Sequence, residues 1–500
     1  MEHERTVDVE GRPRLKRVNR QQLLLRTVDV ENLIPPEHPA RAIWEFVGRL
    51  NLDRFREQVR SLEGWAGRPA LDPQLLVSLW VYSYSQGVSS ARAIERLCEH
   101  DPAYQWLTGL ESISAHTLSS FRVDHPDELR DLFEKVLALL SMEGLVSLER
   151  VMQDGTRVRA CASSGGFRTK ARVEEHLQAA REAVEALDRI GEEESSLRVQ
   201  RARERAARER GQRLEAALRQ FADLEANKSR VDRVSTTDPD ARVMKHADGG
   251  SAPSYNVQIS TDAAHSLIVG IDVTQSGADY RELVPAIDRL ERQGTRPAQV
   301  VVDGGYISSE NIVAMDARGI DLIGPQPQND RAEMNRGKSY AHRAVHADYE
   351  ASRFWYDEES EAYVCPQGKR LRYDAKYERG GVMRYRYKAS AAECRECPVK
   401  NLCCPRNRRG RSIETIEASS PLATYRAKVG TDQTRAIYRT RSQVAEFPNL
   451  WLKAKQGLRQ FHVRSLAKVR TEALWAAITY DIQRWIRLRW AQRQDALQIA

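Results

Sequence analysis

The chain contains the stretch Gln299-Val-Val-Val-Asp303-Gly-Gly305, in which three valines run straight into an acid and two glycines. An uninterrupted apolar run of this kind is typical of a strand that is buried on both faces of a parallel sheet. Residues 148–154 end in the same way, because Glu149-Arg-Val-Met-Gln-Asp154 is followed by Gly155. We therefore predict two strands that each end at a carboxylate and that belong to one sheet.

Further strands and helices surround these two segments. Residues 157–162 and 255–260 alternate between apolar and polar residues, as half-buried strands do, and a further strand is predicted at 267–273. The last two are close enough in sequence to form a hairpin. A helix with Leu283, Ile287 and Leu290 on one face follows, and a second helix leads from residue 303 to the apolar run 320–323. The order predicts an α/β fold with a mixed sheet and flanking helices.

The residues before this region are predicted to be helical. Residues 1–20 are polar and are expected to be disordered, whereas apolar residues recur at helical spacing within 21–142. Helix starts are predicted at Asp72-Pro73, at Ser89-Ser90 and at Ser114, because such residues cap helix N-termini. Basic residues at the helix ends suit a DNA-binding helical module, and an ordinary helical bundle explains them equally well.

Residues 172–230 interrupt the sheet region with charged helical sequence. Apolar residues step by three and four from Val173 to Leu187 and again from Leu214 to Leu224, which predicts an antiparallel helical hairpin with a coiled-coil-like seam. The middle of this segment, 198–213, is rich in arginine. A solvated charged face explains these arginines, and an arm that grips phosphate is the alternative.

A third acid, Glu446, lies in a stretch from Tyr438 to Lys453 that is typical of a long helix. Seven residues make about two helical turns, so Glu446 and Lys453 share a face. Arg441 precedes Glu446 by five residues. A carboxylate flanked by cations can bind a metal ion while the cations contact phosphate. Pro448 removes a backbone donor, so the helix is expected to begin or kink there.

Asp154 and Asp303 are each also explained as turn residues, since Asp-Gly is a common turn dipeptide. Their combination is more informative, because both end strands, both precede glycine, and both belong to one sheet region. Two carboxylates on adjacent strands and a third from a helix can hold two Mg²⁺ ions, an arrangement suited to phosphodiester chemistry.

Five of the seven cysteines lie between the second and third acids, at Cys365, Cys394, Cys397, Cys403 and Cys404. Cys394-Arg-Glu-Cys397 is a Cys-x-x-Cys pair, and four of the five cysteines could form a tetrahedral Zn²⁺ site. We predict Cys365, Cys394, Cys397 and Cys403 as the ligands, with Cys404 as the alternative fourth. A reduced insertion without metal is the other interpretation.

Composition excludes few function classes. The 500 residues include 78 Lys and Arg against 70 Asp and Glu, for a net charge of +8, which fits a polyanionic partner. The sequence has no run of about 18 apolar residues, the length needed to cross a membrane, so it predicts no membrane span. The first residues, Met1-Glu-His-Glu-Arg5, lack the order of a signal peptide, so we expect a cytoplasmic protein. Seven cysteines in a chain of this length do not indicate a disulfide scaffold.

The chain resembles the Asp-Asp-Glu (DDE) transposases of bacterial insertion sequences, in the branch with the Tyr-Arg-Glu-Lys signature. The resemblance spans about residues 20–490. It rests on the segments Gly67–Pro73, Asp154–Ala160, Thr237–Lys245, Tyr255–Ile259, Val302–Tyr306 and Tyr438–Lys453. In this chain four residues, rather than the commoner three, separate Arg441 from Glu446. Cysteine patterns like the one at 365–404 also occur in this branch.

The resemblance implies an RNase H-like catalytic domain formed by 145–330 and 430–490, after a helical DNA-binding domain at 21–142. The hairpin 172–230 and a Cys-rich segment 331–429 would be insertions. In that fold the strands that carry Asp154 and Asp303 lie side by side. These two residues and Glu446 would be catalytic and would bind two Mg²⁺ (or Mn²⁺) ions.

The resemblance also implies the reaction. Water would cleave the phosphodiester bond at the inverted-repeat end of the element, and the freed 3′-OH would attack target DNA, in a complex expected to be a homodimer. Tyr438, Arg441, Lys453 and Arg464 are candidate DNA contacts. A nuclease of the same fold and an inactive DNA-binding protein of transposon origin are the alternatives. Trp475, Trp485 and Trp490 are expected to be packing residues.

Overall fold

The computed structural model describes residues 27–61, 69–189, 197–227, 231–326, 345–405 and 407–491. The segment 1–20, which was predicted to be disordered, lies outside the described residues, as does the turn of the helical hairpin.

The N-terminal region is helical. Its elements are a short 3₁₀ turn, η1 (Glu31–Leu33), and the helices α1 (Pro39–Gly48), α2 (Asp53–Arg56), α3 (Pro73–Ser85), α4 (Ala91–His100), α5 (Pro102–Thr108), α6 (Ala115–Val123) and α7 (Pro126–Met142). The three predicted helix starts are confirmed. The Asp72 carboxylate accepts a hydrogen bond from the Gln74 N–H at 2.8 Å, Ser90 precedes α4, and the Ser114 hydroxyl caps α6.

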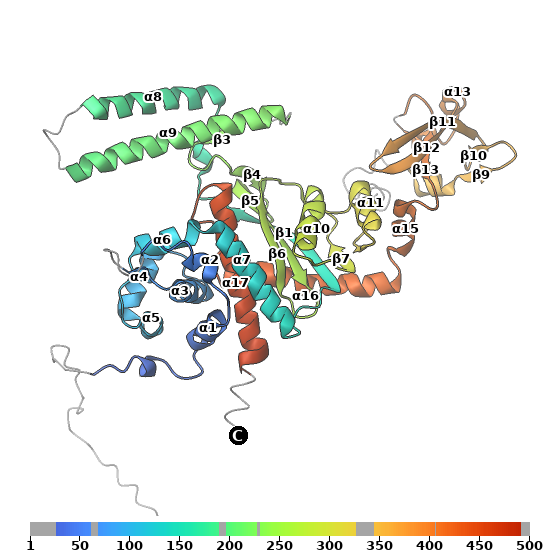
Figure 1. The fold of residues 1–500 in the computed structure, drawn as a ribbon. Coiled ribbons are helices and arrows are strands. Elements are labelled where there is room, and N and C mark those ends of the chain that lie inside the picture. The colour runs from blue at the N-terminus through green and yellow to red at the C-terminus, as the bar shows by residue number, and fades with distance from the viewer. Residues whose placement is uncertain are drawn as a thin grey trace, which may run out of the picture.

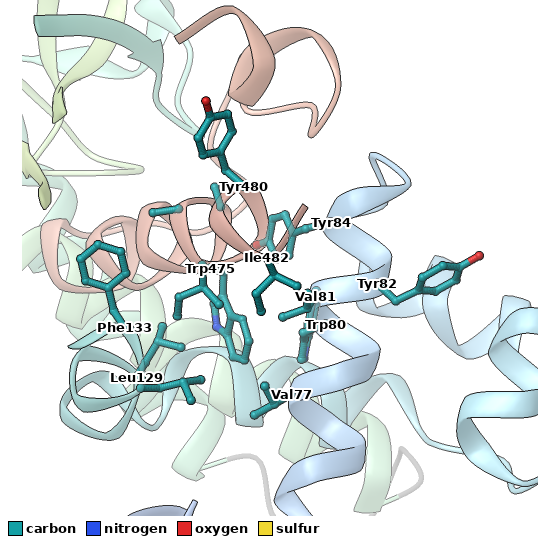
Figure 2. Close-up of a cluster of buried hydrophobic side chains, with 14 of the residues drawn as sticks. Val77, Trp80, Val81, Tyr82, Tyr84, Leu129, Phe133, Trp475, Tyr480 and Ile482 are labelled. Carbon is teal, nitrogen blue, oxygen red and sulfur yellow. The ribbon is translucent and has the colours of Figure 1, made fainter. Parts of the chain in front are cut away.

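The long C-terminal helix α17 (Leu466–Trp485) lies between this helical region and the central sheet, as Figure 1 shows. Trp475 on α17 packs beside Trp80 of α3, within the cluster drawn in Figure 2. Their indole N–H groups donate to the carbonyls of Arg122 and Leu118, at 3.1 and 3.2 Å. Trp475, Trp485 and Trp490 are all buried, as predicted. One core therefore joins segments from the two ends of the chain.

The central sheet has six strands. They are β1 (Arg150–Arg159), β4 (Arg242–Lys245), β5 (Ser251–Asp262), β6 (Ile268–Thr274), β7 (Gln299–Val302) and β8 (Asp321–Ile323). The strands are ordered β4-β5-β1-β7-β8, and β6 also pairs with β5. β1, β7 and β8 run parallel, whereas β5 is antiparallel to β1, β4 and β6. The predicted hairpin of β5 and β6 and the predicted strands at 299–303 and 320–323 are confirmed.

One sequence prediction about β1 was wrong. Residues 148–154 and 157–162 were expected to be separate strands with Asp154 at the end of the first, but β1 continues through Asp154 and Gly155 to Arg159. The reason is the partner strand. β5 pairs with β1 from Val151 to Arg159, whereas β7 reaches only Gln153. Gly155 therefore lies in a strand opposite Gln258 and not in a turn.

Two helices cover one face of the sheet, and two long helices, α17 and the helix before it, cover the other. α10 (Leu283–Arg292) and α11 (Ser309–Ala317) pack on the face that includes Val151, Val300 and Val302. Met152, Val301 and Ile323 face the opposite way and contact Ala445 of α16 (Asp432–Ala454). α16 neither begins nor ends at Pro448 but continues through it.

Two further parts extend from this core (Figure 1). α8 (Lys170–Arg189) and α9 (Leu197–Ala226) lie side by side, with Val173, Leu177, Leu214 and Phe221 in their seam, which confirms the predicted helical hairpin where it is described. Between β8 and α16 lies an antiparallel sheet that the sequence did not predict. It consists of β9 (Trp355–Asp357), β10 (Ala362–Val364), β11 (Arg370–Arg379), β12 (Val382–Ala389) and β13 (Ser412–Ile416), and it is accompanied by α13 (Ala391–Arg395), α14 (Lys400–Cys403) and α15 (Pro421–Lys428).

Within the described ranges, the helices are too short or too polar to cross a membrane.

We expect Trp475→Ala to lower the free energy of unfolding by roughly 3–5 kcal/mol, because it empties a packed site in the core that joins α3, α7 and α17. Thermal or urea unfolding monitored by circular dichroism measures this. Trp355, which is 53% exposed, provides the matched control. Equal effects of Trp475→Ala and Trp355→Ala would contradict the assigned core.

Candidate active site

Asp154 and Asp303 occupy adjacent positions on neighbouring strands. The last parallel pair between β1 and β7 is Gln153 with Val302, so the next residue of each strand is one of the two acids. Successive side chains of a strand point to opposite faces. Met152 and Val301 face α16, and Asp154 and Asp303, two residues further on, therefore lie toward the same face.

The Asp154 carboxylate is held by two donors from α16. The Arg441 guanidinium donates to Oδ1 at 3.0 Å, and the Asn449 amide donates to Oδ2 at 2.8 Å. The pKa of Asp154 is nevertheless raised to about 6. Burial is the main cause, Arg441 opposes it, and the charges of Asp303 and Asp279 add to the rise. Arg441 and Asn449 therefore do not fully offset the cost of burying the negative charge of Asp154.

A single face of α16 supplies these contacts. Arg441, Ala445, Asn449 and Lys453 follow one another at intervals of four residues, which places them along one side of a helix. Ala445 is buried against the sheet, and Lys453 donates to the Thr156 hydroxyl. Burial and the nearby Arg157 lower the pKa of Lys453, while Asp154 raises it. Sequence reasoning missed Asn449, although its spacing from Arg441 could have indicated it.

The structure does not bring Glu446 to the other two acids. Its side chain is exposed, and within the described ranges it forms neither a hydrogen bond nor an ion pair. Tyr438 is half-buried and packs against the apolar cluster that contains Met152 and Val301. Arg464 is exposed and donates to the Cys161 carbonyl at 3.3 Å.

Gly155 faces a buried polar network on the other side of β1. A Cβ at this position would lie 2.5 Å from the Gln258 amide nitrogen, 2.8 Å from an Asp279 oxygen and 3.0 Å from the Tyr306 hydroxyl. The space beside the Gly155 Cα is too small for any side chain, so only glycine fits at this position. This requirement, rather than a turn, explains the glycine after Asp154.

Asp279 is a fourth carboxylate in this region that sequence reasoning missed. It accepts hydrogen bonds from Asn256 at 2.7 Å, from Gln258 at 3.2 Å and from Arg157 at 3.0 Å. Its charge contributes to the raised pKa of Asp154. No local sequence pattern marks it, because its partners come from β1 and β5.

The five cysteines of the insertion line one small cavity of about 20 Å³. The backbone N–H groups of Lys369 and Arg411 donate to the sulfurs of Cys365 and Cys394, at 3.3 and 3.4 Å. Burial raises the pKa of Cys403 to about 12 and also raises that of Cys404.

Among the described residues, the side chains at the two predicted metal sites are not arranged to hold an ion. Across the described ranges, no group of three or more His, Cys, Asp or Glu side chains is placed to hold a metal ion. The predicted zinc ligands Cys365, Cys394, Cys397 and Cys403 therefore share a cavity but are not arranged as a closed tetrahedral site. The three acids Asp154, Asp303 and Glu446 are likewise not placed close enough together in the described structure to hold one ion.

Two models of transposase domains match separate parts of the chain. The family model described as "Transposase domain (DUF772)" matches residues 28–124, which form the N-terminal helices. The family model described as "Transposase DDE domain" matches residues 364–486, which include the cysteines, α16 and α17. A search of curated proteins finds no match. A transposase family implies a DNA substrate and an enzyme of the polynucleotidyl transferase type. The two matched segments together indicate a DDE transposase.

Proposed function

We propose that this chain binds the ends of its insertion sequence, cleaves phosphodiester bonds there and joins the 3′-OH ends to target DNA. The observation that carries the proposal is the β1–β7 register, which sets Asp154 and Asp303 side by side on the face covered by α16. The strand order β6-β5-β1-β7-β8 supports an RNase H-like core. In this order β1 and β7, which would be the first and fourth strands of such a core, are neighbours.

The proposed division of the chain follows from this core. Residues 145–330 and 430–490 would form the catalytic domain, and 21–142 would form the DNA-binding domain. The segments 172–230 and 331–429 would be insertions. The shared core of α3, α7 and α17 supports a fixed relation between the helical region and the catalytic domain.

The donor set at Asp154 and Asp303 fits divalent cations. Both groups are hard oxygen ligands of the type that Mg²⁺ and Mn²⁺ prefer. The pKa of Asp154 is raised chiefly by burial and also by the charges of Asp303 and Asp279, which a cation would neutralise. Asp154 and Asp303 would hold the ions, with Glu446 as the proposed third ligand from α16. Bound cations would supply activation of the attacking oxygen and stabilisation of the leaving oxygen.

The residues of the chain would perform the remaining tasks. Arg441 and Asn449 orient the Asp154 carboxylate through both of its oxygens. Lys453 lies beside Thr156 and Asp154 and would contact a phosphate near the scissile bond. The network of Gln258, Asp279 and Tyr306 supports β1 from the opposite face. Tyr438 is half-buried and would position α16 rather than attack DNA.

A nuclease of the same fold that does not join strands remains the second candidate, and a DNA-binding protein without catalysis is the third. Short inverted repeats that flank the reading frame would favour transposition. Strand-transfer products separate the first candidate from the second, and cleavage separates both from the third.

We expect Asp303→Asn to abolish cleavage of DNA that carries the flanks of the reading frame, while binding of that DNA persists. The substitution removes one negative charge and little volume. Cleavage measured on labelled DNA with Mg²⁺, together with a binding assay, tests this. Asp316, an exposed acid on α11, provides the matched control as Asp316→Asn. Full cleavage by Asp303→Asn would refute the site assignment.

We expect Mg²⁺ to raise the unfolding temperature of the wild-type chain, because a ligand that binds only the folded state stabilises it by about 2.7 kcal/mol at 100 times its Kd. Asp154→Asn should remove this response, since it takes away one of the two adjacent carboxylates. Thermal unfolding with Mg²⁺ and with EDTA measures the difference. An undiminished Mg²⁺ response in Asp154→Asn would place the cation elsewhere.

We also propose that the cysteine cavity binds one structural Zn²⁺ ion. The convergence of five thiols on one cavity and the two N–H groups that donate to sulfur support this. Ligation requires thiolates, so the four sulfurs would have to lose protons and draw together. Either Cys403 or Cys404 would complete the set with Cys365, Cys394 and Cys397.

If this is correct, purified protein should carry about one Zn²⁺ per chain, and Cys397→Ser should lose it. Elemental analysis after dialysis measures the content. Cys98→Ser, at a buried cysteine outside the insertion, is the control. A folded wild-type preparation without zinc would contradict the proposal.

A further inference from the structure

A groove of about 760 Å³ lies beside Asp303, between the catalytic core and the Cys-rich insertion. Its floor includes Gly304 and Gly305, the two residues that follow Asp303. One wall is the beginning of α11, and the opposite wall comes from the β11–β12 hairpin of the insertion, through Arg379 and Arg384. Tyr280 and Arg281 close one side. The groove is therefore built partly from the core and partly from the insertion.

The groove is positively charged. Its lining contains three guanidinium groups, those of Arg281, Arg379 and Arg384, against a single carboxylate from Glu310. Arg281 and Arg379 are exposed, and neither forms an ion pair with another described residue. Arg384 donates to the Ser309 hydroxyl at 3.3 Å and lies 3.8 Å from Glu414, while its Nε is buried without a partner. These donors are suited to an anionic ligand.

The backbone adds to this positive character. α11 begins in the groove, where the Ser308 hydroxyl caps it by accepting from the Asn311 N–H. A helix N-terminus carries partial positive charge and N–H groups directed outward, which favours phosphate. Gly304 and Gly305 present backbone without side chains, so a bulky chain can approach the residue next to Asp303.

The β11–β12 hairpin, which forms the insertion side of the groove, packs closely against the core. Gly380 and Gly381 form the hairpin tip with φ of +63° and +71°. A Cβ at Gly380 would lie 2.9 Å from the Ser309 Cβ, and one at Gly381 would lie 3.2 Å from Val313. Val382, the next residue, is buried in the core cluster that contains Val302. The tip is therefore seated on α11, which places Arg379 and Arg384 on either side of it.

We propose that this groove binds the sugar–phosphate backbone of the DNA strand that leads into the Asp154–Asp303 site, and that the insertion serves to supply half of it. The proposal rests on the proposed function, since it assumes a DNA strand at these acids. Recognition would be through phosphates and thus independent of sequence. The groove lies directly after Asp303, so a strand bound in it continues toward the reacting bond.

The test uses the full chain and a fluorescent DNA duplex of arbitrary sequence, in EDTA so that binding alone is measured. Affinity is determined as a function of salt for the wild type, Arg281→Ala, Arg379→Ala and Arg379→Glu. Arg372→Ala is the matched control, because Arg372 is an exposed arginine of the same strand that does not line the groove. Thermal unfolding confirms that each variant is folded.

We expect weaker binding by Arg281→Ala and Arg379→Ala, a larger loss for Arg379→Glu, and a salt slope smaller by about 0.9 for each phosphate contact removed. Arg372→Ala should match the wild type. Unchanged affinity and slope in all three groove variants, with a wild type that binds DNA, would overturn the groove assignment alone. A wild type without affinity for DNA would overturn the proposed function instead.

A second measurement locates the bound strand. Replacing Tyr280 with the photoreactive residue p-benzoylphenylalanine should give a covalent crosslink to the duplex after irradiation, because the exposed Tyr280 ring borders the groove. The same replacement at Tyr373, an exposed ring on β11 outside the groove, should give none. Crosslinking from Tyr373 and not from Tyr280 would place the DNA on another surface and refute the proposal.

Discussion

The contact of the Asp154 carboxylate with α16 is the interaction on which the arrangement of this site depends. A buried carboxylate is costly unless donors surround it, and here the donors, Arg441 and Asn449, come from a helix almost 300 residues further along the chain. Satisfying Asp154 therefore fixes α16 against β1. α17 follows α16 and forms the common core with the N-terminal helices, so the position of one charged group is coupled to the packing of distant segments.

The contact with α16 does not fully stabilise the charged form of Asp154. Both oxygens of Asp154 have a donor, yet burial and the neighbouring acids still leave its pKa near 6. Strongly shifted groups of this kind concentrate at functional sites, where the shift reflects charges that are kept together for chemistry. A cation that binds Asp154 and Asp303 would relieve this repulsion, but it would also have to share the carboxylate with Arg441 and Asn449.

Much of the core could be predicted from sequence because its signals are local. The three valines before Asp303, the alternation in β5, and the caps at Asp72 and Ser114 each reflect the surroundings of a short segment. Asp154-Gly155 was misread as the end of a strand because the dipeptide favours turns. What decides its conformation is pairing with β5, about 100 residues away. Asp279 could not be predicted for the same reason, because its partners lie on strands that are distant in sequence. The helical spacing of Glu446 predicts which face of the helix it lies on, but it does not predict the distance between Glu446 and the sheet.

The unpredicted sheet β9–β13 has no sequence signal of comparable strength, since most side chains of β11 and β12 are exposed or half-buried and polar. Its place in the fold follows from how its two ends are held. The Tyr425 hydroxyl of α15 donates to the Pro325 carbonyl just after β8, and Lys428 pairs with Asp321 at the start of β8. The chain thus leaves the core and returns to it at the same edge strand. Because the return point is fixed there, α16 can dock on Asp154 whatever the intervening segment contains, and the segment is free to carry arginines to the groove beside Asp303.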